Sequence, residues 1–425
     1  MFRPGRVLRY IALALAATAL AIGAVVGLAP KPPTVASASS SGWVETWAAA
    51  PTDPAHMTAN RANDGFRDQT IRNIIFTSVG GQQVRIRLSN LYGKRPLRIA
   101  AASVGAVASD GNLSTSAYPV TFGGSRSVTI PAGEEMVSDA VPMTVEPLQD
   151  LAVSIYVPQA TGSATYHYFA MQTNYLATGD HVGDAGDQAF TTRDSSWYFL
   201  DGVEVLGADK KAGTVVALGD SITDGIGSTS GLNDRWPNFL ARRLLARYGN
   251  RAPGVVDEGI GGNRVLNPSA CYGPSAVARF NRDVLDQPGV RAVIVLEGIN
   301  DIGYSLAADI GCEAPNTNVS GAEIIGGFKK MIAMAHAHGI KIIGATLTPY
   351  QSAWFWTREG QAKWAAVNRW IRTSHAFDGV ADFDRAVSDP LHPNDMNPLY
   401  TSDGLHGSDL GYQLMADTIN LSLLR

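Results

Sequence analysis

The chain has 425 residues, of which 45% are hydrophobic and 17% are charged, and its formal net charge is −4. This composition is typical of a folded protein with about two domains, and it excludes a disordered chain. No run of Lys or Arg follows the N-terminal leader. Nucleic acid is therefore not expected as a partner, because binding to its phosphates needs a basic surface.

The first 38 residues have the layout of a secretory signal peptide. Three arginines within the first nine residues precede an apolar run from 11 to 28, and Ala36 and Ala38 fit the A-x-A cleavage rule. We therefore expect cleavage after Ala38, an extracellular protein and no stable membrane span afterwards. The apolar run nearly reaches spanning length, so an uncleaved membrane anchor is the alternative.

Residues 43–206 are predicted to form an all-β, sandwich-like domain. Over 84–88, apolar residues alternate with two arginines, as in a strand with one buried face. The Gly80-Gly81 pair is a turn signal, and together with 71–77 it predicts a hairpin. Further short apolar runs are separated by Gly and Pro turns, which indicates a sandwich or barrel; these runs cover 97–107, 127–130, 136–145, 151–157 and 165–173.

Residues 212–425 show apolar strands that alternate with helical segments. Strands are predicted at 214–218, 255–256, 292–296, 341–347 and 380–383. Helices are predicted at 235–248, 322–337, 361–373 and 410–423. This βαβ rhythm predicts an α/β domain with a doubly wound, flavodoxin-like parallel sheet, whose ligands lie at the carboxyl ends of the strands.

Four polar segments follow the predicted strands or precede the last helix, at 219–225, 258–264, 297–301 and 403–406. Because parallel strands end on one edge of a sheet, we expect these segments to converge there.

The residue types in these segments suit ester hydrolysis. The hydroxyl of Ser221 becomes a nucleophile only when a base takes its proton, and the imidazole of His406 can be that base. Asp403 lies three residues earlier, where its carboxylate can hold the other ring N–H. The side-chain amide of Asn300 and backbone N–H groups of Ser221 and a glycine can then stabilise the oxyanion.

The order Gly-Asp-Ser with a following Asp-Gly, a Gly-rich turn, Gly-x-Asn-Asp and Asp-x-x-His resembles the SGNH (GDSL) hydrolases, from Ala212 to the end of the chain. The resemblance implies Ser221 as nucleophile and first oxyanion donor, Gly262 and Asn300 as further donors, and His406 with Asp403 completing the triad. It also implies carboxylic ester substrates and no metal or other cofactor. Segments 43–47 and 84–92 resemble a β-rich domain that precedes this catalytic domain in some secreted bacterial members.

Two assignments have rivals in the sequence. Asp389 and His392 also satisfy Asp-x-x-His, but the later pair directly precedes the last predicted helix, as the fold requires. Gly261 is the alternative to Gly262 as oxyanion donor.

Asp301 is expected to brace its loop rather than to join the triad. No Gly-x-Ser-x-Gly elbow occurs, which argues against an α/β-hydrolase.

Cys271 and Cys312 are the chain's two cysteines, and in an oxidising compartment they predict a disulfide at the rim of the site. Two buried free thiols are the alternative, and no Cys/His cluster suggests zinc.

Other histidines have structural interpretations. His336 and His338 are expected at a helix end, and His167 and His181 are expected to be ordinary strand and loop residues. Trp354 and Trp356 either line a pocket or pack a loop.

The sequence therefore predicts a secreted serine ester hydrolase that acts through an acyl-enzyme on short-acyl or O-acetylated carbohydrate esters. A lipase or phospholipase acting on longer acyl chains is the alternative. A carbohydrate-binding protein with an inactive hydrolase domain is a further one. The expected partners are small-molecule, polysaccharide or lipid esters, and the leading β domain could bind carbohydrate, cover the site or stabilise its neighbour.

Overall fold

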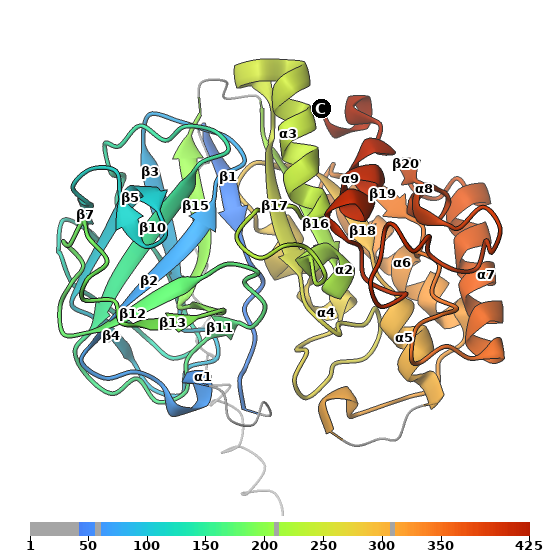
Figure 1. Cartoon of the computed structure of the whole chain (residues 1–425), viewed down its shortest axis with the longest axis horizontal. Helices are drawn as coiled ribbons and strands as arrows, with labels where there is room; N and C mark the ends of the chain where they lie inside the picture. Colours follow the sequence, from blue (N-terminus) through green and yellow to red (C-terminus); the bar gives the residue numbers. More distant parts are fainter. Residues whose placement is uncertain (1–41, 56–60, 208–211, 307–310) are drawn as a thin grey trace, which may run out of the picture. The chain divides into compact units, whose positions relative to one another are not determined.

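The computed structural model describes residues 42–425 except 56–60, 208–211 and 307–310. The predicted signal peptide lies outside the described residues. We call residues 43–206 the β region and residues 212–425 the α/β region (Figure 1). No helix in the described part of the chain is long and apolar enough to cross a membrane.

A five-stranded sheet forms the centre of the α/β region, in the order β17-β16-β18-β19-β20. All neighbouring strands run parallel. This is the 2-1-3-4-5 order of flavodoxin-like sheets. The central strand β16 is wholly buried, as a continuous apolar run predicts. The parallel sheet is therefore confirmed, with strands β16 (Thr214–Gly219), β17 (Gly254–Gly259), β18 (Val290–Leu296), β19 (Lys341–Ala345) and β20 (Gly379–Ala381).

The helices of the α/β region pack in two groups. Helix α3 (Trp236–Tyr248) lies against α9 (Asp409–Asp417), whereas α6 (Gly321–Ala337) lies against both α4 (Ala276–Phe280) and α7 (Arg358–Thr373). The helices predicted at 235–248, 322–337 and 361–373 are confirmed within a few residues. The shorter helical segments were not predicted, and they include α4 as well as α2 (Ser221–Asp224), a π-helical turn (Asn281–Leu285), α5 (Ile299–Gly303) and α8 (Phe383–Val387).

The last predicted helix, 410–423, is too long. It ends at Asp417, and a separate 3-10 turn covers Leu421–Leu424. The hydroxyl of Thr418 donates to the carbonyl of Met415, and the side chain of Asn420 accepts from the backbone N–H of Ser422. Such local side-chain bonds compete with helix continuation, which explains the break.

The β region contains two larger antiparallel sheets. One has four strands, in the order β1 (Trp43–Ala48), β15 (Leu200–Leu206), β3 (Val84–Ser89) and β9 (Glu135–Val137). The other has seven: β13 (Thr192–Asp194), β12 (Asn174–Thr178), β2 (Gln69–Phe76), β10 (Asp150–Val157), β5 (Ala101–Ser109) and β6 (Asn112–Leu113), with β7 (Tyr118–Val120) beside β5. Buried side chains of both sheets belong to one hydrophobic core. The sandwich-like packing itself stays a prediction.

Smaller elements complete the β region. They are α1 (Arg61–Asp64), the strand pair β4 (Leu97–Ile99) and β8 (Val128–Ile130), and the pair β11 (Tyr166–His167) and β14 (Trp197–Tyr198).

The predicted hairpin of 71–77 with 84–88 is wrong. Strand β2 pairs with β10 and β12, whereas β3 pairs with β15 and β9, so the two segments belong to different sheets. Gly80 and Gly81 instead lie where the chain crosses close to other backbone. A Cβ atom at these positions would lie 2.4 Å from the carbonyl oxygen of Val145 and 2.6 Å from that of Leu206, respectively.

The β region packs directly on the edge strand of the parallel sheet. A Cβ atom on Gly254, at the start of β17, would lie 2.0 Å from the carbonyl oxygen of Glu45 in β1. The backbone N–H of Val255 donates to Oγ of Ser78 at 2.9 Å, and the N–H of Glu45 donates to Oγ1 of Thr214 at 3.2 Å. The two regions therefore share backbone contacts, and β1 lies beside β17 (Figure 1).

This contact predicts the effect of a side chain at Gly254. Gly254→Val should lower the free energy of unfolding by about 1–3 kcal/mol, because overpacking forces the two backbones apart. Thermal unfolding measures the loss. The matched control is Gly326→Ala on helix α6, where a Cβ atom would meet nothing within 4 Å, and which should stabilise by up to about 1 kcal/mol. An unchanged midpoint for Gly254→Val would contradict the tight contact.

Candidate active site

Three side chains from distant parts of the chain form a continuous hydrogen-bonded line at the carboxyl edge of the parallel sheet. Ser221 begins α2 directly after β16, and its Oγ lies 2.9 Å from Nε2 of His406. Nδ1 of the same ring lies 2.6 Å from Oδ2 of Asp403. A hydroxyl, an imidazole and a carboxylate in this order can remove a proton from the serine and stabilise the resulting imidazolium.

The turn that presents Ser221 depends on its neighbours. The side chain of Asp220 caps α2 by accepting from the N–H of Ile222 at 2.9 Å, and Gly225 ends the helix in a left-handed conformation with φ 91°. Gly219 allows the turn to close, because a Cβ atom there would lie 2.0 Å from Oγ1 of Thr223. Burial raises the pKa of Asp220 to about 7, although the hydrogen bond from Ile222 opposes this.

A tight turn places the carboxylate of Asp403 beside Nδ1 of the His406 ring. One carboxylate oxygen, Oδ1, accepts from the backbone N–H groups of Leu405 at 2.9 Å and His406 at 2.8 Å. Partial burial alone would raise the pKa of Asp403, but the hydrogen bonds from the ring and the backbone of His406 lower it below its usual range. Asp403 is therefore ionised and can accept the Nδ1–H of the ring.

Gly262 and Asn300 lie on the two neighbouring strand ends. Gly262 has φ 77°, and a Cβ atom on it would lie 2.4 Å from the ring of Tyr272, so only glycine fits. The backbone N–H of its rival, Gly261, already donates to Oδ2 of Asp224 at 3.0 Å. This contact favours Gly262 as the donor to a substrate.

The side-chain amide of Asn300 is buried and oriented by one hydrogen bond. Its Nδ2 donates to the carbonyl of Asn263 at 2.9 Å, and an amide nitrogen carries a second proton for another acceptor. The adjacent Asp301 binds backbone groups of the loop that follows β17. Its carboxylate accepts from the N–H groups of Val265 at 2.7 Å and Leu266 at 3.2 Å, so it braces the loop, as expected. Burial raises the pKa of Asp301 to about 6.

The rival pair Asp389 and His392 takes a different role. His392 is exposed, and Oδ1 of Asp389 accepts from the backbone N–H groups of Leu391 at 2.7 Å and His392 at 3.3 Å. The carboxylate thus closes an Asx-type turn. It is His406 whose ring reaches Ser221.

Arg279 was not singled out in the sequence, yet its buried guanidinium holds the strand ends together. It donates to the carbonyls of Gly219 at 2.9 Å and Glu258 at 2.7 Å, and to the side chain of Asn263 at 3.0 Å. Asp283 and Glu297 balance its charge. Because Arg279 is a single arginine in a helix that the sequence did not predict, no sequence pattern indicated that it would bind the strand ends.

His167 lies in strand β11, as expected for a strand residue, but its side chain contacts the α/β region. It is 5% exposed, and its Nε2 lies 3.0 Å from Oδ1 of Asp224, three residues after Ser221. The two residues are far apart in the sequence and no local pattern connects them. His181, by contrast, lies in a loop, where its ring pairs with Asp184.

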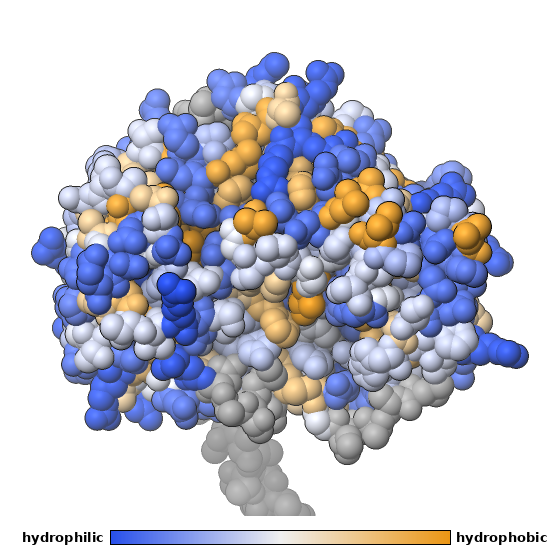
Figure 2. Space-filling model, viewed as in Figure 1, coloured by the Kyte–Doolittle hydropathy of each residue, from blue (hydrophilic) through white to orange (hydrophobic). Residues whose placement is uncertain are grey.

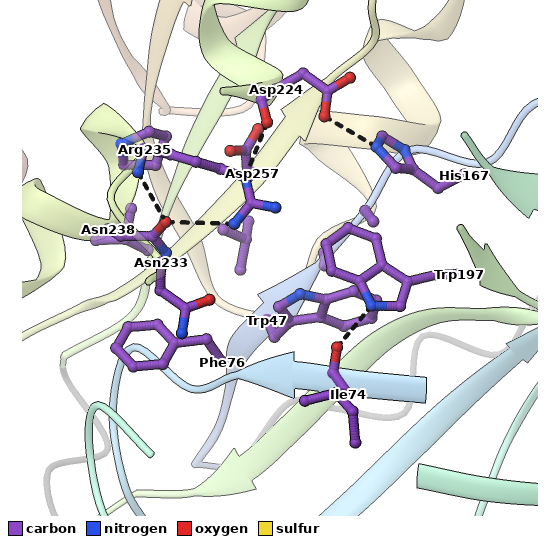
Figure 3. A pocket seen from close by; sticks show the side chains of 15 residues that line it. Trp47, Ile74, Phe76, His167, Trp197, Asp224, Asn233, Arg235, Asn238 and Asp257 are labelled. Carbon is purple, nitrogen blue, oxygen red and sulfur yellow. Dashed lines mark hydrogen bonds and ion pairs between the residues drawn. The ribbon is translucent and has the colours of Figure 1, made fainter. Parts of the chain in front are cut away.

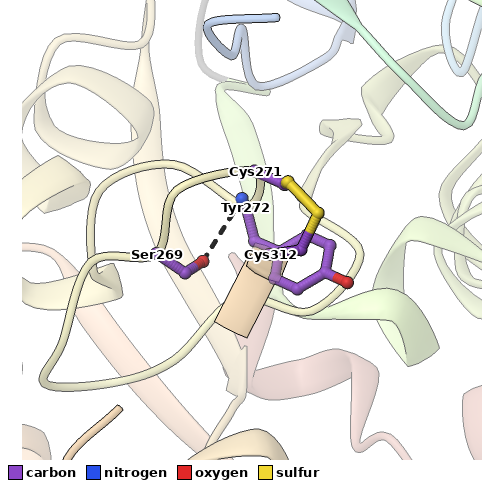
Figure 4. The surroundings of a disulfide bond; sticks show 4 residues. All are labelled: Ser269, Cys271, Tyr272 and Cys312. Carbon is purple, nitrogen blue, oxygen red and sulfur yellow. Dashed lines mark hydrogen bonds between the residues drawn. A yellow bond between two sulfur atoms is a disulfide. The ribbon is translucent and has the colours of Figure 1, made fainter. Parts of the chain in front are cut away.

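Cys271 and Cys312 form the predicted disulfide (Figure 4). The bridge joins the loops that follow β17 and β18. The adjacent Tyr272 donates its backbone N–H to Oγ of Ser269, and its ring covers Gly262. The bridge therefore lies one residue from a side chain that shapes the site.

Aromatic side chains extend from Tyr272 along the rim. The ring of Tyr304 stacks on Tyr272 with centroids 6.4 Å apart, and the ring centroid of Trp354 lies 6.4 Å from that of Tyr304. Trp354 is 75% exposed, which places it on the surface of the rim. Trp356, by contrast, packs against the core and donates its indole N–H to Gln361. Of the two tryptophans, only Trp354 offers an open aromatic face.

Within the described residues, no group of three or more His, Cys, Asp or Glu side chains has the arrangement of a metal site. The histidines at the end of α6 bind protein groups instead. The ring of His338 lies 2.9 Å from the carbonyl of Met334, and the ring of His336 lies 2.9 Å from Asp378.

Comparison with known families identifies one match within the chain. Residues 217–414 match the model of the GDSL-like lipase/acylhydrolase family. This segment includes Ser221, Gly262, Asn300, Asp403 and His406, whereas His167 of the β region lies outside it. The comparison with curated proteins finds no match.

Solved structures also resemble part of the chain. A putative acylhydrolase from Bacteroides fragilis is 23% identical, with a TM-score of 0.38, and the match covers 52% of this chain and 91% of that one. A GDSL-like lipase from Bacteroides thetaiotaomicron is 20% identical, with a TM-score of 0.37, over 51% and 89% of the two chains. An acetyl xylan esterase from Geobacillus stearothermophilus is 20% identical, with a TM-score of 0.39, over 50% and 94%.

The position of the disulfide predicts that its removal will affect both stability and activity. Replacing Cys271 and Cys312 together by serine should lower the free energy of unfolding by about 4 kcal/mol, because the bridge closes a loop across 41 positions. The looser loop should also reduce ester hydrolysis. Denaturant unfolding and initial rates test the two effects. If stability and rate both equalled those of the unmodified protein, the bridge would have no structural role.

Proposed function

Because this chain belongs to the GDSL-like lipase/acylhydrolase family and is a carboxylic ester hydrolase, we propose that Ser221, His406 and Asp403 are its catalytic triad. The observation that carries this proposal is the unbroken line of hydrogen bonds from Oγ of Ser221 through the imidazole to the Asp403 carboxylate. The family match lies on the same residues, since it covers 217–414.

In the first half of the proposed reaction, Nε2 of His406 takes the hydroxyl proton of Ser221 while Oγ attacks the ester carbonyl carbon. The carbonyl π electrons move to the oxygen and give a tetrahedral oxyanion. When this intermediate collapses, the C–O bond to the alcohol breaks and His406 returns the proton to the departing oxygen. Asp403, which the turn keeps ionised, stabilises the imidazolium between these two transfers.

In the second half, water replaces the alcohol. His406 takes a proton from the water, whose oxygen attacks the acyl carbon, and the second tetrahedral intermediate releases the carboxylic acid and restores Oγ–H. The backbone N–H groups of Ser221 and Gly262 and the amide of Asn300 are the proposed oxyanion donors in both halves. A single donor of this kind lowers the activation barrier by about 3–4 kcal/mol.

We propose short-acyl or O-acetylated carbohydrate esters as substrates. The support comes from the rim, where Tyr272, Tyr304 and the open face of Trp354 lie side by side. The exposed ring of Trp354 can pack against the C–H face of a sugar ring, and the hydroxyl of the half-buried Tyr272 can meet a sugar hydroxyl, while the buried Tyr304 supports both rings.

Exposed leucines support a second candidate, hydrolysis of longer acyl esters. Leu399 is 72% and Leu410 48% exposed, and Oγ of Ser408, two residues after His406, donates to the carbonyl of Leu399. An acyl chain could lie on such side chains. Figure 2 shows hydrophobic side chains in small separate groups on the face that it views, rather than in one broad surface.

Secretion is also part of the proposal. The leader of 1–38 supports it by its sequence, and the Cys271–Cys312 bridge supports it because disulfides persist in oxidising compartments.

The triad proposal predicts that Ser221→Ala and His406→Ala each lower kcat by at least about 10⁴-fold on p-nitrophenyl acetate without changing the melting temperature, because the nucleophile and its base act as a unit. His392→Ala is the matched control and should retain the full rate. Near-normal activity of His406→Ala together with an inactive His392→Ala would assign the triad to the upstream pair instead. Serine-dependent activity should also be lost after reaction with a phosphonate ester.

The two substrate proposals predict opposite results in an ester series from acetate to palmitate. For a carbohydrate esterase, kcat/KM should fall with chain length, and Trp354→Ala should raise KM for an acetylated oligosaccharide several-fold while sparing p-nitrophenyl acetate. For a lipase, the rate should rise with chain length, and Leu399→Ser should lower it selectively on palmitate. Each variant serves as the control for the other.

A further inference from the structure

His167 reaches into the α/β region from strand β11. Its ring is buried, with Nε2 3.0 Å from Oδ1 of Asp224 (Figure 3). Nδ1 of the same ring lies 2.9 Å from the carbonyl oxygen of Ala50. Ala50 also belongs to the β region. The histidine is therefore anchored on its own region while its other nitrogen contacts the segment that carries Ser221.

The partners of this ring indicate its protonation. A carbonyl and a carboxylate are both acceptors, so both ring nitrogens donate when Asp224 is ionised. Burial lowers the pKa of His167, but the charge and hydrogen bond of Asp224 outweigh this and leave the pKa raised. The other charged groups lining the same small cavity are Arg235 and Asp257, and Nε of Arg235 donates to the carbonyl of Asp224.

The other oxygen of the same carboxylate reaches the glycine turn. Oδ2 of Asp224 accepts from the N–H of Gly261 at 3.0 Å, and Gly261 directly precedes the proposed oxyanion donor Gly262. One carboxylate thus accepts a hydrogen bond from the β region on one oxygen and from the glycine turn on the other. A glycine turn has little stiffness of its own, so these bonds fix its orientation.

Phe169 contacts the same turn from a second direction. A Cβ atom on Gly261 would lie 3.0 Å from the ring of Phe169, and the side chain of Ile226 lies close by. The ring of Tyr168 packs edge-on against Phe169, with centroids 4.2 Å apart. The segment from His167 to Phe169 therefore holds the turn through a charged hydrogen bond and an apolar contact.

We propose that His167 is a positioning residue of the hydrolase: it holds Asp224 against the N–H of Gly261 and thereby orients Gly262 toward the oxyanion. The β region is then part of the catalytic apparatus and not only an accessory. This inference rests on the proposed function, because it needs Gly262 to act as an oxyanion donor. A misplacement of about 1 Å in such a donor lowers rates by about 10²-fold.

The test compares His167→Gln with the unmodified full chain on p-nitrophenyl acetate. We expect kcat to fall by about 10–10²-fold with KM nearly unchanged, since substrate binding is retained while transition-state contacts weaken. The rate of inactivation by a phosphonate ester, which also forms a charged tetrahedral group on Ser221, should fall in parallel.

Ser78→Ala is the matched control. Oγ of Ser78 also joins the two regions, through the N–H of Val255 at 2.9 Å, but in the first half of β17, away from its carboxyl end. This variant should lower the melting temperature without lowering kcat. Equal losses of kcat in Ser78→Ala and His167→Gln would show that any loosening of the contact between the regions has the same effect, and would overturn the proposal.

A double-mutant cycle tests the route through Asp224. If His167 acts through that carboxylate, His167→Gln should lower kcat in the unmodified protein but not further in Asp224→Asn. Full additivity would overturn the route. If His167→Gln does not fold, Phe169→Ala removes the second contact with the turn at a half-buried position, and it should lower kcat in the same way.

The outcomes separate this inference from the function on which it rests. An active Ser221→Ala variant would reject the triad, and with it the oxyanion role. If activity depends on Ser221 but folded His167→Gln turns over at the normal rate, the triad stands and the positioning role is rejected.

Discussion

A buried guanidinium holds together the strand ends on which the proposed catalytic groups depend. Arg279 donates to backbone carbonyls at the ends of β16 and β17 and to the side chain of Asn263, whose carbonyl in turn accepts from Asn300. A charge buried in this way is tolerated only when ion pairs and hydrogen bonds satisfy it, as Asp283 and Glu297 do here. The segments that carry the nucleophile and the oxyanion donors are thereby tied to one fixed centre.

The same edge is held from outside by the β region. Near the start of the parallel sheet, backbone contacts join β1 to β17, and at the carboxyl end His167 and Phe169 meet the loops beside Ser221. A glycine turn that must leave an N–H free for a substrate needs support from its neighbours, because the glycines themselves have many accessible conformations. Support from another part of the chain is one way to reduce that freedom.

Local patterns were a good guide to the α/β region and a poor one to strand pairing in the β region. The buried strands of a parallel sheet are continuous apolar runs between helices, so both their positions and their parallel direction could be predicted. Strand pairing in an antiparallel region depends on partners far away in the chain. Gly80-Gly81 therefore suggested a hairpin, whereas the residues are small because other backbone passes close to them. Helix α9 ended early for a local reason, the side-chain bonds of Thr418 and Asn420.

The sequence by itself determined which chemistry this chain carries: a serine after the first strand, a glycine turn, an asparagine and an Asp-x-x-His pair are enough to predict an ester hydrolase. The tertiary structure decided which of two such pairs reaches the serine, which glycine N–H is already occupied, and that a histidine of the β region belongs to the surroundings of the site. The reason is physical. Residue types and their spacing fix what a group can do, whereas contacts between residues far apart in the sequence exist only after the sheet and its neighbouring region have packed.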